Sequence, residues 1–117
     1  MHRIATFLFV VFVDTPSQVA GHLGETEIQM SCEVHGFIRS IYFSTWLDRD
    51  EKAIISDDIK YTIVQKMGSR HAILQNSETV PSLVSILTVH QLELSDAGTY
   101  TCEVGGNKSS VELFVGT

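Results

Sequence analysis

The stretch LSDAGTYTCEV, residues 94–104, places a tyrosine two positions before a cysteine and an Asp-x-Gly just before that tyrosine. The chain has one other cysteine, Cys32, in its first third. Whether Cys32 and Cys102 meet decides the fold, because two cysteines so far apart in the sequence can join only elements that tertiary structure brings together.

Apolar and polar residues alternate around both cysteines. In ETEIQMSCEV, residues 25–34, one face carries Ile28, Met30, Cys32 and Val34. The second stretch has Tyr100, Cys102 and Val104 on one face. A period of two is typical of a half-buried β-strand, so each cysteine is predicted to point inward from its own strand.

The rest of the chain also favours short strands. Candidate strands are residues 41–52, with the only tryptophan, and residues 53–58, 60–65, 69–77, 82–90 and 109–115. Gly105, Gly106 and Asn107 indicate a tight hairpin, because glycine and asparagine accept positive φ angles. No helical period is evident, and many short strands separated by turns predict an all-β sandwich.

If the two cysteine strands face each other across a sandwich, their sulfurs can bond through its centre. Closing so long a loop would stabilise the domain by about 4 kcal/mol in the chain-entropy model. Tyr100 could then turn its hydroxyl back onto the backbone, and Gly98 would permit the tight backbone before it. Asp96 is expected to pair with a base at the opposite corner; we favour Arg70, with Lys60 as the alternative.

Cys32, Trp46, Leu87 and the run Asp96-x-Gly98-x-Tyr100-x-Cys102 resemble the signature of an immunoglobulin-superfamily domain. The resemblance covers residues 21–115. It implies a two-sheet Greek-key sandwich with an inter-sheet disulfide, Trp46 packed on the bridge, and a role in recognition rather than catalysis.

Two subsets of that family are similar to this chain. In the variable set, residues 53–58 and 60–65 would be two additional strands and Arg70 would begin the next one. In the intermediate set, the connection between the fourth and fifth core strands would be lengthened.

The N-terminus is predicted to be a secretory leader over residues 1–20, followed by one domain over residues 21–117. A short basic start precedes an apolar run from Ile4 to Val13, which has the size of a signal core and is too short to span a bilayer. The alternative is an apolar first strand, because phenylalanine, valine and isoleucine also favour strands. We expect a secreted protein or the extracellular part of a cell-surface protein.

The formal net charge of −6 argues against nucleic acid and anionic membrane as partners, because both favour a basic surface. No catalytic residues are predicted: His90, Ser95 and Asp96 are neighbours in sequence, whereas a triad converges from separate elements. The histidines lack metal-ligand spacing, so neither a metal nor another cofactor is expected. The tripeptide Asn107-Lys108-Ser109 is an acceptor sequence for N-glycosylation.

One sheet is predicted to expose a binding face. If Trp46, Cys102 and Leu113 point inward, the residues that point outward are Phe43, Leu47, Glu103, Glu112 and Phe114. The three apolar ones would form a patch with an acidic rim, as protein interfaces do. The leading hypothesis is an extracellular module that binds another protein, including another copy of itself. The alternative is a structural spacer in a longer adhesion or muscle-type protein.

Overall fold

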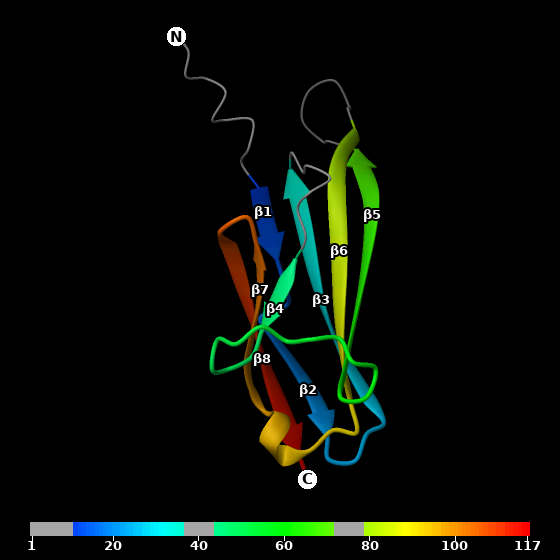
Figure 1. Cartoon of the computed structure of the whole chain (residues 1–117), viewed down its shortest axis with the longest axis vertical. Helices are drawn as coiled ribbons and strands as arrows, with labels where there is room; N and C mark the ends of the chain where they lie inside the picture. The colour runs from blue at the N-terminus through cyan, green and yellow to red at the C-terminus, as the bar shows by residue number, and fades with distance from the viewer. Residues whose placement is uncertain (1–10, 37–43, 72–78) are drawn as a thin grey trace.

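The computed structural model describes residues 11–36, 44–71 and 79–117. Within these residues the chain forms two stacked sheets of four strands each (Figure 1). The first sheet has the order β1 (Val11–Asp14), β3 (Glu27–Gly36), β6 (Thr79–His90) and β5 (Tyr61–His71). The second has the order β2 (Gln18–His22), β8 (Asn107–Gly116), β7 (Gly98–Val104) and β4 (Thr45–Leu47). This is the predicted all-β sandwich with Greek-key connections.

Strand direction is antiparallel at every pairing of the described strands except one. β2 runs parallel to β8, from Gln18 opposite Glu112 to His22 opposite Gly116. The chain changes sheets between β1 and β2 through three residues that include Pro16. Proline has no backbone N–H to give to a ladder, so it suits the point where the chain leaves one sheet for the other.

The core fills the space between the sheets with the inward residues of both. β7 shows the alternation clearly, since Tyr100, Cys102 and Val104 are buried while the residues between them are not. The other fully buried large side chains include Met30, Val34, Trp46, Leu87, Val89, Leu92, Val111 and Leu113. The period-two pattern in the sequence therefore matches the face that each strand buries.

The folded domain begins earlier than residue 21. Residues 11–20, which were predicted to belong to a leader, supply β1 and most of β2, and Val13 and Val19 pack against the core. The alternative of an apolar first strand therefore describes this segment, because a run of valine and phenylalanine suits a sheet as well as it suits a signal core. The leader prediction for residues 1–10 lies outside the described residues.

A single long strand, β5, replaces the two short strands predicted over residues 53–58 and 60–65. Residues 54–60 are irregular, and Ala53 forms only an isolated bridge with Leu47. β5 pairs with β6 from Tyr61 opposite Val89 to His71 opposite Thr79. No strand begins at Arg70, as the variable-set alternative requires, and the connection between β5 and β6 on which the intermediate-set alternative depends lies outside the described residues.

The molecule is elongated, with extents of 56 × 27 × 23 Å. β1 enters in the upper half of Figure 1 and β8 ends at the opposite end, beside the C-terminus. The two ends of the described domain therefore lie far apart along its longest dimension.

Candidate functional site

The centre of the sandwich holds the disulfide between Cys32 and Cys102. Their Cα atoms lie 6.4 Å apart and both side chains are fully buried. Cys32 lies on β3 in one sheet and Cys102 on β7 in the other, so the bond joins the two sheets as predicted.

A hydrogen bond runs beside the disulfide from one sheet to the other. Trp46 lies opposite Cys102 in the β4–β7 pair, and its indole N–H donates to Ser85 Oγ at 3.0 Å. Ser85 lies opposite Cys32 in the β3–β6 pair and is fully buried. Sequence reasoning missed Ser85. The sequence did contain a signal for it. A buried indole N–H needs an acceptor, and Ser85 lies two residues from both Leu83 and Leu87, so it shares their inward face of the strand.

The corner before β7 is organised by Asp96, which ends the short 3₁₀ helix η2 (Leu94–Asp96). The Tyr100 hydroxyl donates to the Asp96 backbone carbonyl at 2.6 Å, and this hydrogen bond is buried. Asp96 Oδ2 accepts from the Glu93 backbone N–H and from Lys60 Nζ, both at 2.7 Å. The tyrosine therefore closes the corner in the way its spacing from Cys102 predicts.

The base that pairs with Asp96 is Lys60, the alternative, and the prediction of Arg70 is wrong. Lys60 precedes β5 directly, whereas Arg70 lies opposite Val80 near the far end of that strand. Ten residues of strand span about 33 Å, so Arg70 is at the other end of the sheet.

Asp57 positions Lys60. Its Oδ1 accepts backbone N–H groups from Ile59, Lys60 and Tyr61 at 2.9, 3.0 and 3.2 Å. These hydrogen bonds lower the pKa of the Asp57 carboxyl below its ordinary value, because they stabilise the ionised form. The turn they fix directs Lys60 toward the corner, where Nζ also donates to the Gln91 carbonyl at 3.2 Å.

Two tyrosines near the corner are held in the neutral form. Burial raises the pKa of Tyr100 well above its ordinary value, and the neighbouring Tyr61 and Asp96 raise it further. Burial also raises the pKa of Tyr61, again with a contribution from the Asp96 carboxylate.

Gly98 makes room for an arginine that sequence reasoning did not single out. Its φ is +142°, and a Cβ added there would lie 3.1 Å from Arg49 Cδ. Arg49 crosses this point and donates from Nη1 to the Ala97 carbonyl at 2.9 Å. A side chain at residue 98 would therefore strain the backbone and displace Arg49.

The outer face of the second sheet is polar where the apolar patch was expected. Phe43 lies outside the described residues. Leu47 is half-buried opposite Thr101, and Phe114 is exposed on β8, four residues beyond Ser110, the partner of Thr101. Four residues of strand cover about 13 Å, so Leu47 and Phe114 do not meet.

Hydrogen-bonded polar pairs occupy the area between these two apolar side chains. Thr99 Oγ1 donates to Glu112 Oε1 at 2.6 Å, and the Thr101 and Ser110 hydroxyls lie 2.9 Å apart. Glu103 extends the polar surface opposite Lys108. The predicted acidic residues thus lie on this face, but they belong to a continuous polar surface and do not rim an apolar patch.

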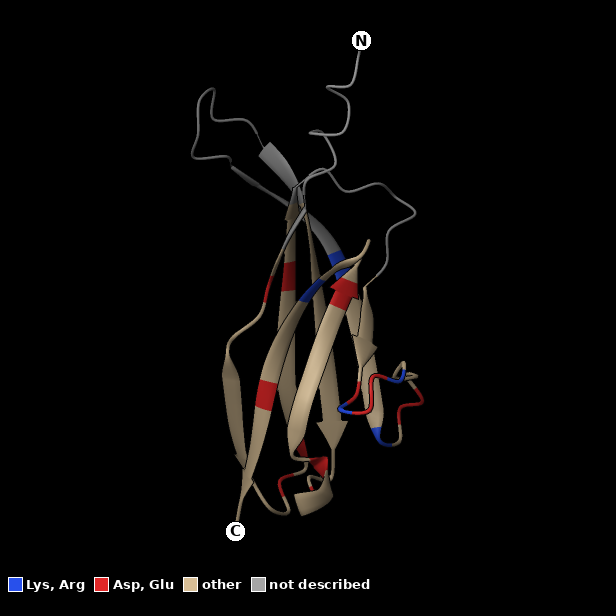
Figure 2. Ribbon diagram, turned by 90° about the vertical axis from the view of Figure 1, so that its left-hand side faces the viewer, with Lys and Arg blue, Asp and Glu red and all other residues tan. Residues whose placement is uncertain are grey.

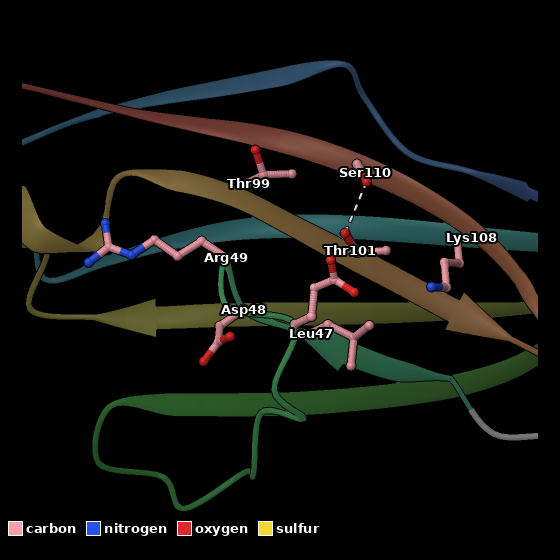
Figure 3. A pocket seen from close by; sticks show the side chains of 8 residues that line it. Leu47, Asp48, Arg49, Thr99, Thr101, Lys108 and Ser110 are labelled. Atoms are coloured by element: carbon pink, nitrogen blue, oxygen red, sulfur yellow. Dashed lines mark hydrogen bonds between the residues drawn. The ribbon is translucent and has the colours of Figure 1, made fainter.

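A shallow hollow of about 370 Å³ lies on this face, over β4, β7 and β8 (Figure 3). Arg49 and Lys108 lie at opposite ends of the hollow, with the Thr101–Ser110 pair between them. The other lining residues are Leu47, Asp48, Glu51 and Thr99. Figure 2 shows acidic and basic positions scattered along these strands and concentrated in the segment after β4. The hollow therefore offers charges of both signs and little apolar surface.

Asn107 is exposed and is the first residue of β8. It follows Gly105 and Gly106, whose φ angles are +57° and +87°, as a tight two-residue hairpin turn requires. Ser109, the third residue of the acceptor sequence, has its Oγ 2.7 Å from Thr15 Oγ1.

Within residues 11–36, 44–71 and 79–117, no three histidine, cysteine, aspartate or glutamate side chains are grouped as a metal ion would need. The described part of the chain likewise has no helix of the length and apolar composition needed to cross a membrane.

The two stacked sheets, the disulfide between them, the buried indole and the tyrosine corner define an immunoglobulin-like domain. Among solved structures, a domain described as "IG27 protein domain" matches with a TM-score of 0.62 at 16% identity, over 92% of this chain and 98% of that one. Domain I10 from titin matches with a TM-score of 0.60 at 18% identity, over 91% of this chain and 98% of that one.

A third similar structure comes from a complex described as Dpr11 IG1 bound to DIP-gamma IG+IG2. Its TM-score is 0.56 at 15% identity, over 89% of this chain and 50% of that one. No protein-family model matches the sequence, and no curated protein matches it. At these identities the structural likeness establishes the fold, and function has to be argued from the site.

Proposed function

We propose that this domain is a structural module of a longer multidomain protein of the adhesion or muscle type, without catalytic activity. The observation that carries the proposal is the position of its two ends. β1 enters at one end of a domain 56 Å long and β8 leaves at the other (Figure 1). Modules joined through such ends form an extended row, which is the geometry that a spacer needs. The likeness to a titin domain supports the same role.

The internal bonds of the domain suit a spacer because they keep its two ends in a fixed relation. The disulfide and the Trp46–Ser85 hydrogen bond hold the sheets together at the centre. The Lys60–Asp96 ion pair and the Tyr100 hydroxyl hold the corner near the C-terminal end. A module stabilised at both places keeps its two ends at a nearly constant distance and orientation.

The size of the natural polypeptide tests this proposal. An antibody raised against the denatured domain should detect, on a denaturing gel of the natural source, a band far larger than the 13.0 kDa of this chain. A single band at the size of the chain would contradict the proposal. Pre-absorption of the antibody with the purified domain should remove the large band, which controls for cross-reaction.

A second candidate function is recognition of another protein, including another copy of this chain. The observation that favours it is the hollow on the outer face of the second sheet, which Arg49 and Lys108 line together with acidic Asp48 and Glu51. Charges of both signs on a binding surface give specificity and speed of association more than affinity. The net charge of −6 suits a basic partner surface.

Charge reversal tests the homophilic form of this second function. Sedimentation velocity over a range of concentrations should show self-association that Lys108→Glu weakens. The matched control is Lys66→Glu, an exposed lysine on β5 in the other sheet, which should leave association unchanged. A wild-type chain that stays monomeric at every concentration would refute homophilic binding.

We also propose that the domain is exported from the cell. The support is the buried disulfide, because such bonds persist in oxidising compartments and are rare in the cytosol. Protein taken from its natural source and alkylated without reductant should have the mass of the bridged form. Two alkylated cysteines would contradict export and favour an intracellular muscle-type domain.

A further inference from the structure

We propose that Asn107 carries an N-linked oligosaccharide in the natural protein. The tripeptide Asn107-Lys108-Ser109 has the required asparagine and hydroxyl residue, with no proline between them. The only other asparagine, Asn76, is followed by serine and glutamate and has no acceptor sequence. The inference goes beyond the spacer function, since it holds for an exported chain of any length.

The fold leaves room for a large group at this position. Asn107 follows the two-residue turn of the β7–β8 hairpin and is exposed, as are Gly105, Gly106 and Lys108 around it. The first fully buried residue of β8 is Val111, four positions further on. A glycan on the Asn107 amide would therefore extend into solvent without disturbing the core.

The third residue of the acceptor sequence indicates when the transfer takes place. Ser109 is half-buried in the folded domain, and its hydroxyl lies 2.7 Å from Thr15 Oγ1 in the connection between β1 and β2. An enzyme that must engage the Ser109 hydroxyl would reach it before this connection packs against β8. We infer that the sugar is added to the unfolded chain and that the domain then closes with Asn107 still facing solvent.

The transfer needs one co-substrate, an oligosaccharide linked through a diphosphate to a polyisoprenoid lipid. A bond forms between Asn107 Nδ2 and the anomeric carbon of the first sugar. The bond from that carbon to the diphosphate oxygen breaks, and the lipid diphosphate leaves with the electron pair. Nδ2 gives up one proton to water, so atoms and charge balance and the step involves no oxidation or reduction.

The location of this glycan would restrict what the domain can touch. The β7–β8 turn lies beside β1 in Figure 1, on the half of the molecule where β1 enters. Lys108, the next residue, lines one end of the polar hollow. A sugar at Asn107 would therefore screen that end of the hollow and the adjoining side of the domain from a protein partner.

Synthesis of the full chain behind a cleavable secretory signal, with and without microsomal membranes, tests the proposal. Resistance to added protease reports entry into the membrane lumen, and an increase in mass that an N-glycanase removes reports the sugar. The wild-type chain should be protected and should gain one glycan. Asn107→Gln and Ser109→Ala should remain protected without the gain, whereas Ser109→Thr and Asn76→Gln should keep it.

The glycan readout and the alkylation test of the two cysteines separate this inference from the proposal of export on which it rests. A protected wild-type chain without the mass gain would overturn glycosylation and leave export standing. Two alkylated cysteines in the natural protein would overturn export, and glycosylation with it. The spacer function does not depend on either result.

Discussion

Lys60 Nζ and Asp96 Oδ2 lie 2.7 Å apart, and this ion pair ties the start of β5 to the connection between β6 and β7. The aspartate side chain is 6% exposed and the lysine side chain 29%. The same carboxylate oxygen accepts the Glu93 backbone N–H. One buried oxygen therefore fixes two segments of the chain, so removal of the lysine should affect the whole corner.

Replacement of Lys60 by methionine should lower the free energy of unfolding by about 1–3 kcal/mol, because the buried Asp96 carboxylate would lose its charged hydrogen-bond partner and keep only the Glu93 backbone N–H. Partial exposure of the lysine to solvent favours the lower half of that range. Urea denaturation measures the loss. Arg70→Met is the matched control, and it should cost less because residue 70 lies at the other end of β5 from the Asp96 corner; equal losses in the two variants would contradict the assignment.

Replacement of Ser85 by alanine should also destabilise the domain by about 1–3 kcal/mol, because the Trp46 indole N–H would be left buried without an acceptor. Ser31→Ala is the control. Ser31 is exposed on β3, and its loss should change stability by less than about 0.5 kcal/mol. Denaturation followed by tryptophan fluorescence reports both variants, and a Ser85→Ala protein as stable as Ser31→Ala would show that the hydrogen bond contributes little.

Loss of the disulfide should cost about 4 kcal/mol in the chain-entropy model, because the bond closes a loop with a sequence separation of 70. The double variant Cys32→Ala and Cys102→Ala, compared with the oxidised wild-type domain in urea, measures this loss. Intact mass with and without reductant should differ by about 2 Da, the two hydrogens released on bridging. A double variant of wild-type stability would mean that the two sheets hold together without the bond.

Stability should fall at alkaline pH because of Tyr100 and Tyr61. The pKa of each phenol is raised in the folded domain, mainly by burial, so above about pH 10 the unfolded chain releases these protons more readily than the folded one. The stability that the two neutral phenols contribute to the folded domain is complete below that pH and is lost as the pH rises. The free energy of unfolding, measured between neutral pH and about pH 11, should show this decline.

Tyr100→Phe provides the control for the alkaline decline. This variant should lose about 0.5–1.5 kcal/mol at neutral pH, because the hydrogen bond to the Asp96 carbonyl is gone. Its stability should then fall less steeply with pH than that of the wild type, with Tyr61 responsible for the remaining slope. An unchanged slope would show that Tyr100 titrates normally in the folded domain.

The centre of the fold was predictable because its signals are local and periodic. Alternation around Cys32 and Cys102 gives the inward face of two strands, and the spacing of Tyr100 from Cys102 gives the corner. These patterns depend only on which side of a strand each residue occupies. They do not depend on where neighbouring strands begin or how they are shifted against each other.

The Asp96 partner was mispredicted because sequence alternation does not fix where β5 begins. Residues 53–58 look like a strand by composition, yet Ile55 is 76% exposed and lies in an irregular segment. The Asp57 carboxylate organises that segment through backbone hydrogen bonds that composition does not reveal. β5 therefore begins at Tyr61, which moves Lys60 to the corner and Arg70 away from it.

The outer face was mispredicted because of strand register. Leu47 and Phe114 both point outward, as the alternation along each strand predicts. The register of β4, β7 and β8 nevertheless places polar pairs between them. Contact between two side chains depends on the face of the sheet that each occupies and on the register of the strands. The alternation in the sequence predicts the face but not the register. Ser85 was missed for the same reason. Its inward direction could be predicted from the alternation, but its position opposite Cys32 could not.

The parallel pairing of β2 with β8 has a mechanical consequence. When the two ends of the domain are pulled apart, β2 is drawn toward its beginning and β8 toward its end. Because the strands run in the same direction, these forces act along the pair and load its hydrogen bonds together, from Gln18 opposite Glu112 to His22 opposite Gly116. Such a pair shears all at once instead of unzipping bond by bond. Under tension, the domain should therefore stay closed up to a threshold force and then give way abruptly.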